Sequence, residues 1–291
     1  MSLVVLTMVP FFVDAAEFGK VRREKHVVPE SHASFWVYYS EGTAESKRPC
    51  VLVAAAGSRL FHGMRLTEED VPEHLPYAKA GFVVIAYDVS GPVAESAPDR
   101  TVFAACRLFK DADGGIRDGL TALEAAEKKY KFIDPVEVYV AGHSSAGTVA
   151  LALAQRSERV KGCVAYAPVC DPHLWIGEEY LAVLESGVPG FGNFLATYSP
   201  KMNTISMKCP VLIFHAEDDP RVLPAVVDDY VSRLKATNKW VTHIKVKHGG
   251  HYESMIASGL PKGVAWLCDL RARMVEPGSA ANGTAVAKPG Y

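Results

Sequence analysis

Apolar runs and helical patterns alternate along most of the chain. Continuous apolar runs such as PCVLVAAAGS (49–58), FVVIAYDVSG (82–91) and CPVLIFHA (209–216) are typical of strands buried on both faces of a parallel sheet. Between them lie segments whose apolar residues recur every three or four positions, as in 113–130, and this spacing predicts helices. Further strands are predicted at VEVYVAG (136–142), VKGCVAYAPV (160–169) and WVTHIKVKH (240–248), and further helices at 70–81, 145–156, 225–237 and 253–274. The pattern predicts an α/β fold with a mostly parallel central sheet flanked by helices.

Two segments depart from this alternation. KHVVPE (25–30) and SFWVYYSEG (34–42) have the composition of two strands joined by a short turn, which predicts a hairpin at an antiparallel edge of the sheet. Residues 171–208 are rich in aromatic residues, Gly and Pro, and we expect them to form a cap insertion over the sheet rather than a separate domain. The predicted α/β domain therefore covers residues 21–275.

The two ends of the chain have a different character. LVVLTMVPFFV (3–13) is too short to span a bilayer but matches the apolar region of a signal peptide, although the first cation is Lys20. We expect residues 1–16 to be a signal peptide, with export to the periplasm or outside the cell, or else a hydrophobic arm packed on the domain. The tail 276–291 is rich in Gly, Ala, Ser and Pro, and we expect it to be disordered.

Composition and charge narrow the choice of partners. The net charge is −2, and 49% of residues are hydrophobic, so nothing indicates a nucleic-acid partner or a stable membrane span. The sequence has ten histidines but contains neither an HExxH nor a CxxC motif, so no metal site and no cofactor are expected. The six cysteines could form up to three disulfides, but Cys50, Cys163 and Cys209 lie in or beside apolar runs, which favours buried thiols. Composition does not indicate the oligomeric state.

The stretch VYVAGHSSAG (138–147) carries the most specific chemical signal. An apolar strand ends in a tight turn that leads directly into a helix, with Gly142 and Ala146 two positions before and after Ser144. A serine on such a turn projects its hydroxyl group, and its neighbours must be small to avoid clashes. Ser145 is the competing candidate, but the bulky His143 would then occupy the position before the turn. The alternative interpretation is an ordinary strand-to-helix turn with a capping serine.

An acid and a base follow the next two strands. A serine hydroxyl becomes a strong nucleophile when a histidine accepts its proton and a carboxylate orients that histidine. FHAEDDPRV places Asp218 and Asp219 after one strand, and VKHGGHYES places His248 and His251 after the next. Because the carboxyl ends of parallel strands meet at one edge of a sheet, serine, acid and base are expected to lie together.

These motifs resemble those of the α/β-hydrolase superfamily, and the resemblance covers roughly residues 25–270. GHSSAG is similar to the nucleophile elbow of that superfamily, CPVLIFHAEDDPRV to PVLxxHGxxDxxV, and GGHY to the GGH of the catalytic histidine. The resemblance implies the catalytic residues Ser144, Asp219 and His251. It also implies an oxyanion hole formed by the backbone N–H groups of Ser58 and Ser145, although AAAGS replaces the usual His-Gly-X.

Within the superfamily, the prolyl oligopeptidase and dienelactone hydrolase branches are the most similar. Prolyl oligopeptidases cover the site with a large propeller domain, for which a chain of this length has no room, and dienelactone hydrolases usually carry cysteine at the elbow. The expected function is therefore a serine hydrolase of small carboxylic esters, with peptidase, thioesterase or acyltransferase activity and a non-catalytic binding protein as alternatives. The aromatic residues of the insertion either line an acyl pocket or pack the insertion onto the sheet; they are Trp175, Tyr180, Phe191, Phe194 and Tyr198.

Overall fold

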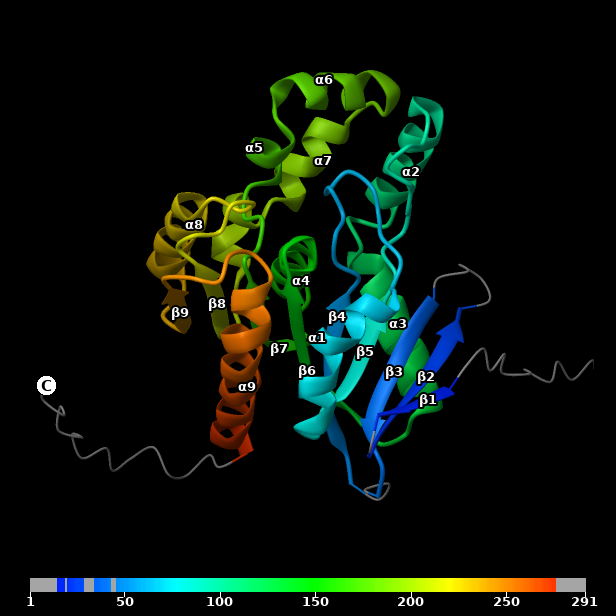
Figure 1. Ribbon diagram of the computed structural model, residues 1–291, viewed down its shortest axis with the longest axis vertical. Helices are drawn as coiled ribbons and strands as arrows, with labels where there is room; N and C mark the ends of the chain where they lie inside the picture. The colour runs from blue at the N-terminus through cyan, green and yellow to red at the C-terminus, as the bar shows by residue number, and fades with distance from the viewer. Residues whose placement is uncertain (1–14, 19, 29–33, 43–45, 276–291) are drawn as a thin grey trace, which may run out of the picture.

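A nine-stranded sheet forms the centre of the computed structural model, which describes residues 15–18, 20–28, 34–42 and 46–275 (Figure 1). The strand order is β1-β2-β3-β5-β4-β6-β7-β8-β9. Strands β4 to β9 run parallel, whereas β1, β2 and β3 pair with their neighbours in antiparallel fashion. The strands are β1 (Ala15–Phe18), β2 (Val21–Val27), β3 (Ser34–Ser40), β4 (Arg48–Ala54), β5 (Val83–Tyr87), β6 (Ile133–His143), β7 (Val160–Tyr166), β8 (Val211–Ala216) and β9 (Val241–Val246). The predicted mostly parallel α/β sheet is confirmed.

Helices cover both faces of this sheet, so its central strands are buried on both sides. Alternate residues of one strand enter different cores: Leu52 of β4 packs in the larger core, and Val51 and Val53 pack in the smaller one. The helices are α1 (Val71–Lys79), α2 (Asp99–Asp111), α3 (Ile116–Lys129), α4 (Ser145–Arg156), α5 (Pro172–Ile176), α6 (Glu178–Gly187), α7 (Phe191–Tyr198), α8 (Pro224–Thr237) and α9 (Leu260–Val275). Residues of α3, α4 and α8 pack in the larger core, and residues of α1 and α9 pack in the smaller one.

The structure differs from the sequence-based prediction in three elements. Helix α2 lies in a stretch that the sequence pattern left unassigned, although its buried residues Ala105, Cys106 and Phe109 have helical spacing. Strand β1 extends the expected hairpin by one strand. The predicted closing helix is present, but it contains a π-helical turn (Met255–Gly259) that leads directly into α9.

Residues 171–208 form α5, α6 and α7 and a 3₁₀ segment (Pro200–Ser206). Together with α2, these helices lie beyond the carboxyl ends of the strands (Figure 1). The side chains of Arg107 and Lys110 on α2 donate hydrogen bonds to the carbonyls of Gly187 and Pro189, which fixes the cap against α2.

Three further expectations concern the ends of the chain, the membrane and the cysteines. Residues 1–14 and 276–291 lie outside the described residues, so the expectations of a signal peptide, export and a disordered tail stay predictions. In the described part of the chain, no helix combines the length and the apolar character needed to cross a bilayer. All six cysteines lie in described segments and are unpaired; five are buried and Cys268 is exposed.

Candidate active site

The turn between β6 and α4 holds Ser144 in an unusual backbone conformation. Its φ is 55° and its ψ is −121°, a left-handed φ that costs a non-glycine residue free energy and is concentrated at functional sites. Gly142 makes the turn possible, because a Cβ atom there would lie 2.4 Å from the backbone carbonyl of Ala146. The backbone N–H of Ser144 donates to the carbonyl of Tyr166 at 2.9 Å, so the turn is anchored to the end of β7.

The two serines of the turn have different surroundings. Ser144 is half-buried, whereas Ser145 is 2% exposed and begins α4. The hydroxyl of Ser145 accepts a hydrogen bond from the backbone N–H of Ser58 at 3.0 Å. Ser144 therefore holds the strained and accessible position at the turn, and Ser145 contacts the loop that follows β4.

Asp219 and His251 form the closest acid–base contact at this edge of the sheet. His251 Nδ1 lies 2.7 Å from Asp219 Oδ2, and the side chain of Asp219 is fully buried. The other oxygen of Asp219 accepts the backbone N–H groups of Arg221 and Val222 at 2.8 and 3.0 Å. Burial disfavours the charged form, but the bonds from His251, Val222 and Arg221 outweigh it and lower the pKa of Asp219. The ionised carboxylate can only accept, so Nδ1 of His251 carries the proton and Nε2 is left as the base.

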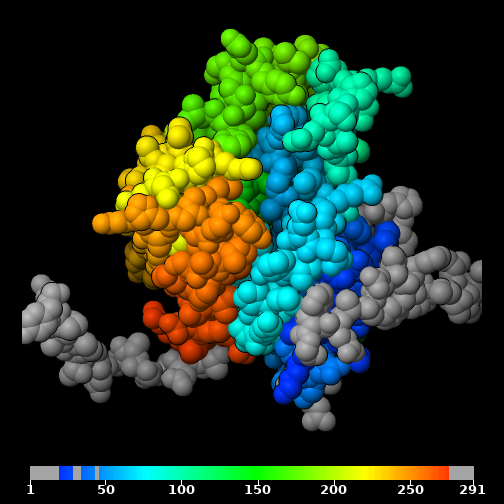
Figure 2. Space-filling view, viewed as in Figure 1, coloured from blue at the N-terminus to red at the C-terminus, as the bar shows by residue number. Residues whose placement is uncertain are grey.

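The alternative acid and base form a different arrangement. Asp218 accepts the backbone N–H groups of Gly249 and Gly250 at 3.1 and 2.9 Å. Its contact with His248 Nδ1 is longer, at 3.5 Å, and the His248 side chain is 86% exposed. Asp218 therefore holds the loop that carries His251, whereas Asp219 holds the imidazole itself. Figure 2 shows the segments after β8 (yellow) and β9 (orange) side by side below the cap.

His143 connects the serine turn to the histidine loop. Its Nε2 donates to the backbone carbonyl of His251 at 3.0 Å, and the two imidazole rings are 4.6 Å apart. Its Nδ1 faces Glu73 of α1 at 3.7 Å, and both side chains are buried. His143 therefore packs directly against the proposed base. Sequence reasoning missed the contributions of Glu73 and of the Asp218–glycine bonds, because both join segments that are remote in the chain.

The loop after β4 differs from the arrangement expected for the oxyanion hole. The backbone N–H of Ser58 was expected to face the oxyanion, but it is bound to the hydroxyl of Ser145. The hydroxyl of Ser58 bonds within its own loop, where it accepts the Leu60 N–H at 3.0 Å and donates to the His62 carbonyl. The expected donor is thus engaged by the side chain of Ser145 at the start of α4.

The aromatic residues of the cap divide into two groups. Phe191 and Tyr198 are fully buried and Phe194 is 9% exposed, which supports packing of the insertion rather than substrate contact for Phe191 and Phe194. Trp175 and Tyr180 are 43% and 41% exposed. The ring of Tyr180 lies 5.0 Å from that of Phe61, so the cap contacts the loop that carries Ser58.

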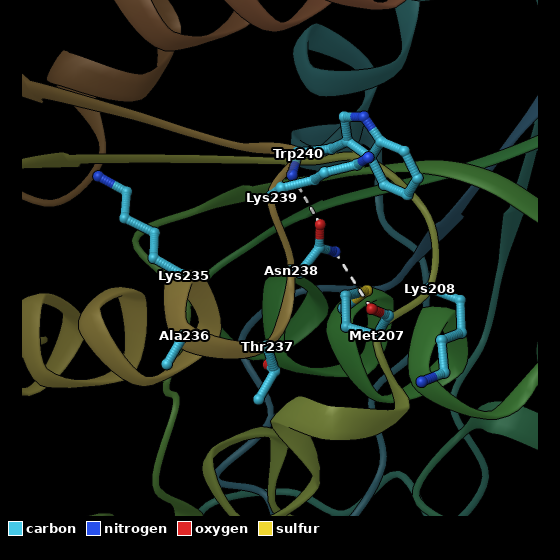
Figure 3. A pocket seen from close by; sticks show the side chains of 8 residues that line it. All are labelled: Met207, Lys208, Lys235, Ala236, Thr237, Asn238, Lys239 and Trp240. Carbon is cyan, nitrogen blue, oxygen red and sulfur yellow. Dashed lines mark hydrogen bonds between the residues drawn. The ribbon is translucent and has the colours of Figure 1, made fainter.

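A cavity of about 350 Å³ lies at the amino ends of β8 and β9, opposite to the carboxyl ends that carry the candidate active site (Figure 3). Its lining comes from the residues that precede β8 and β9, including Met207, Asn238 and Trp240. The side chain of Asn238 donates to the Met207 carbonyl at 3.1 Å and accepts the Trp240 N–H at 2.8 Å. Ser144, Asp219 and His251 all follow the carboxyl ends of strands, where ligands of α/β sheets bind, so this cavity is separate from the candidate active site.

The family match and the fold place this protein among the serine hydrolases of the α/β-hydrolase superfamily. The sequence matches the prolyl oligopeptidase family over residues 72–267. This match covers more than half of the chain, and the protein belongs to that family. The resemblance inferred from the sequence motifs is confirmed. No curated protein matches the sequence.

Solved structures with the same fold include hydrolases of two sizes. S-formylglutathione hydrolase from Agrobacterium tumefaciens is 17% identical with a TM-score of 0.64, and the match covers 89% of this chain and 98% of that one. Oligopeptidase B from Leishmania major is 17% identical (TM-score 0.61; 89% and 37% covered). A puromycin-hydrolyzing peptidase from Mycobacterium tuberculosis is 18% identical (TM-score 0.65; 86% and 39% covered). The chain spans 35% to 41% of the length of the first peptidases that it matches.

Proposed function

We propose that this protein hydrolyses small carboxylic esters through an acyl-enzyme formed on Ser144. One observation carries the proposal: Asp219 and His251 are hydrogen-bonded at 2.7 Å. In addition, His143 joins the His251 backbone to the turn that presents Ser144. A half-buried serine on a strained turn, joined through His143 to the loop of a histidine whose tautomer is fixed by a buried carboxylate, is an arrangement suited to nucleophilic acyl transfer.

The proposed reaction has two balanced steps. His251 Nε2 takes the proton of Ser144 as Oγ attacks the acyl carbon, and Asp219 stabilises the imidazolium. The imidazolium then protonates the leaving alkoxide as its bond to the acyl carbon breaks. Water next attacks the acyl group, His251 takes its proton, and the carboxylic acid leaves as the proton returns to Ser144 Oγ.

In this proposal, both the backbone N–H and the hydroxyl group of Ser145 stabilise the oxyanion. Its N–H lies at the start of α4, where the helix dipole favours negative charge. Its hydroxyl accepts the Ser58 N–H, so its own proton can be directed toward the oxyanion. The proposed donors are therefore the N–H and the O–H of Ser145, with the Ser58 amide orienting that hydroxyl.

Peptidase activity on the same residues is the second candidate, and the family match favours it. A small acyl substrate draws support from S-formylglutathione hydrolase, whose named substrate is a thioester and which the chain matches over 98% of its length. The peptidases are matched over a much smaller share of theirs. Thioesterase or acyltransferase chemistry would use the same intermediate with another leaving group or acceptor.

Fluorophosphonate labelling tests the proposal directly. We expect the wild type to be labelled on Ser144, and Ser144→Ala to lose both the label and the turnover of p-nitrophenyl acetate, butyrate and octanoate. Turnover of aminoacyl or peptidyl p-nitroanilides that exceeds ester turnover would favour the peptidase candidate. A label on Ser145, or full turnover in Ser144→Ala, would refute the assignment. A wild type that neither takes the label nor turns over any substrate would favour a non-catalytic binding protein.

A further inference from the structure

Two histidines and an aspartate converge between α8 and the strands β8 and β9. His215 lies on β8, His243 on β9 and Asp228 on α8. In the pairing of β8 with β9, Ile213 lies opposite His243 and His215 opposite Lys245. Because side chains alternate along a strand, the two histidines point to the same face, which α8 covers. One ligand atom from each of His215, Asp228 and His243 lies within 4.8 Å of the others.

One polar atom in this cluster has no protein partner. His215 is 1% exposed, and its Nε2 is buried with no hydrogen-bond partner in the described structure. The nearest carboxylate oxygen, Asp228 Oδ1, is 3.8 Å away, which is too far for a hydrogen bond. A buried polar atom without a partner is unfavourable, and a bound ion is one arrangement that satisfies such an atom.

The remaining contacts leave a suitable set of ligand atoms. His243 Nε2 lies 3.3 Å from His215 Nδ1 and 3.8 Å from Asp228 Oδ1. Lys245 bonds the other oxygen, Asp228 Oδ2, at 2.9 Å, so Oδ1 is the oxygen that faces the histidines. In a tetrahedral zinc site with bonds of about 2.0–2.1 Å, the ligand atoms are about 3.3 Å apart. Asp228 Oδ1 lies 3.8 Å from both His215 Nε2 and His243 Nε2, so these atoms must move closer by about 0.5 Å to surround one ion. The 3.3 Å contact of His243 involves the other ring nitrogen of His215, Nδ1.

We propose that His215, His243 and Asp228 bind a divalent transition-metal ion, with Zn²⁺ as the ion that two imidazoles and a carboxylate favour. The Asp228 side chain is 40% exposed and that of His243 is 12% exposed, so an ion and a fourth ligand from water can reach the site from solvent. His215 lies four positions before Asp219 on the same chain segment. The ion would join β8, α8 and β9 just below the loop that carries the catalytic acid.

Zinc binding to the full chain tests this proposal independently of esterase activity. After treatment with a chelator, the protein is titrated with Zn²⁺ against a chromophoric competitor, and Co²⁺ is added separately to detect the absorption bands of tetrahedral coordination. We expect one ion per chain, an affinity that falls at least tenfold in His243→Ala and Asp228→Ala, and a thermal midpoint that Zn²⁺ raises in the wild type but not in these two variants.

His173→Ala is the matched control, because His173 is also a histidine beside a carboxylate, 3.6 Å from Glu178, but on the surface. We expect this variant to bind Zn²⁺ like the wild type. Asp228→Ala changes a partly exposed helix residue, and circular dichroism checks that it folds, so it tests the site even if His243→Ala misfolds. Absence of stoichiometric binding, or equal binding in Asp228→Ala and the wild type, would overturn the proposal.

Discussion

Replacing Asp219 by asparagine tests whether this carboxylate sets the proton position on His251. Oδ1 of Asp219 accepts two backbone N–H groups at 2.8 and 3.0 Å, and Oδ2 faces His251 Nδ1 at 2.7 Å. In Asp219→Asn, the single amide oxygen remains with the two backbone donors, so the NH₂ group must face the imidazole. That group donates to Nδ1, which forces the imidazole proton onto Nε2 and removes the base that Ser144 needs.

The expected loss is large because the wrong tautomer blocks catalysis without disturbing the packing. A serine hydrolase whose buried aspartate is changed to asparagine loses about 10⁴-fold in kcat, which corresponds to about 5 kcal/mol of transition-state stabilisation. We expect a similar loss of kcat for p-nitrophenyl acetate and butyrate, with KM changed by much less. Circular dichroism checks that the fold is retained.

Asp218→Asn is the matched control at the adjacent position. Asp218 accepts two backbone N–H groups of the histidine loop, and asparagine keeps one acceptor oxygen, so we expect kcat to fall by less than about tenfold. The reasoning fails if folded Asp219→Asn keeps more than a tenth of the wild-type kcat. It also fails if Asp218→Asn loses as much activity as Asp219→Asn.

Three further predictions follow from the same structure. Ser145→Ala should lower kcat for esters at least about tenfold, because it removes a donor to the oxyanion. Unchanged or higher turnover would show that the oxyanion is bound instead by the Ser58 N–H, which this substitution releases from the Ser145 hydroxyl. Gly142→Ala should lower both fluorophosphonate labelling and the thermal midpoint, since a Cβ at 2.4 Å from backbone atoms costs about 1–3 kcal/mol as the turn opens; a normal midpoint and label would contradict the close packing. Burial and Lys129 lower the pKa of His26 to about 4, and burial and Arg23 lower that of His74 to about 3, so the unfolded chain binds these protons first. The free energy of unfolding should therefore be at its full value above about pH 6.5, and each of the two histidines should lower it by about 1.4 kcal/mol per pH unit as the pH falls toward 4. Urea unfolding measures this dependence. A free energy of unfolding that is constant from pH 7 to 5 would contradict the prediction.

The order of elements and the candidate triad could be predicted from the sequence because their signals are local. Continuous apolar runs mark strands that are buried on both faces, and small residues around Ser144 mark the tight turn that a projecting serine needs. The acid and the base were found for a related reason. Parallel strands bring their carboxyl ends to one edge, so polar residues after two successive strands could be expected to meet. Helix α2 shows the limit of this approach, since its polar surface concealed the helical spacing of its buried residues.

The remaining features depend on contacts between segments that are far apart in the chain. The sequence alone determined the strand and helix pattern and the residue types at the strand ends, because local burial and turn geometry impose them. Only the tertiary structure decided that Asp218 holds a backbone loop while Asp219 holds His251, and that the Ser145 hydroxyl takes the Ser58 amide. Only the tertiary structure likewise brought His215, Asp228 and His243 together. Strand register and helix packing set which side chains face each other, and neither can be read from the spacing of neighbouring residues in the sequence.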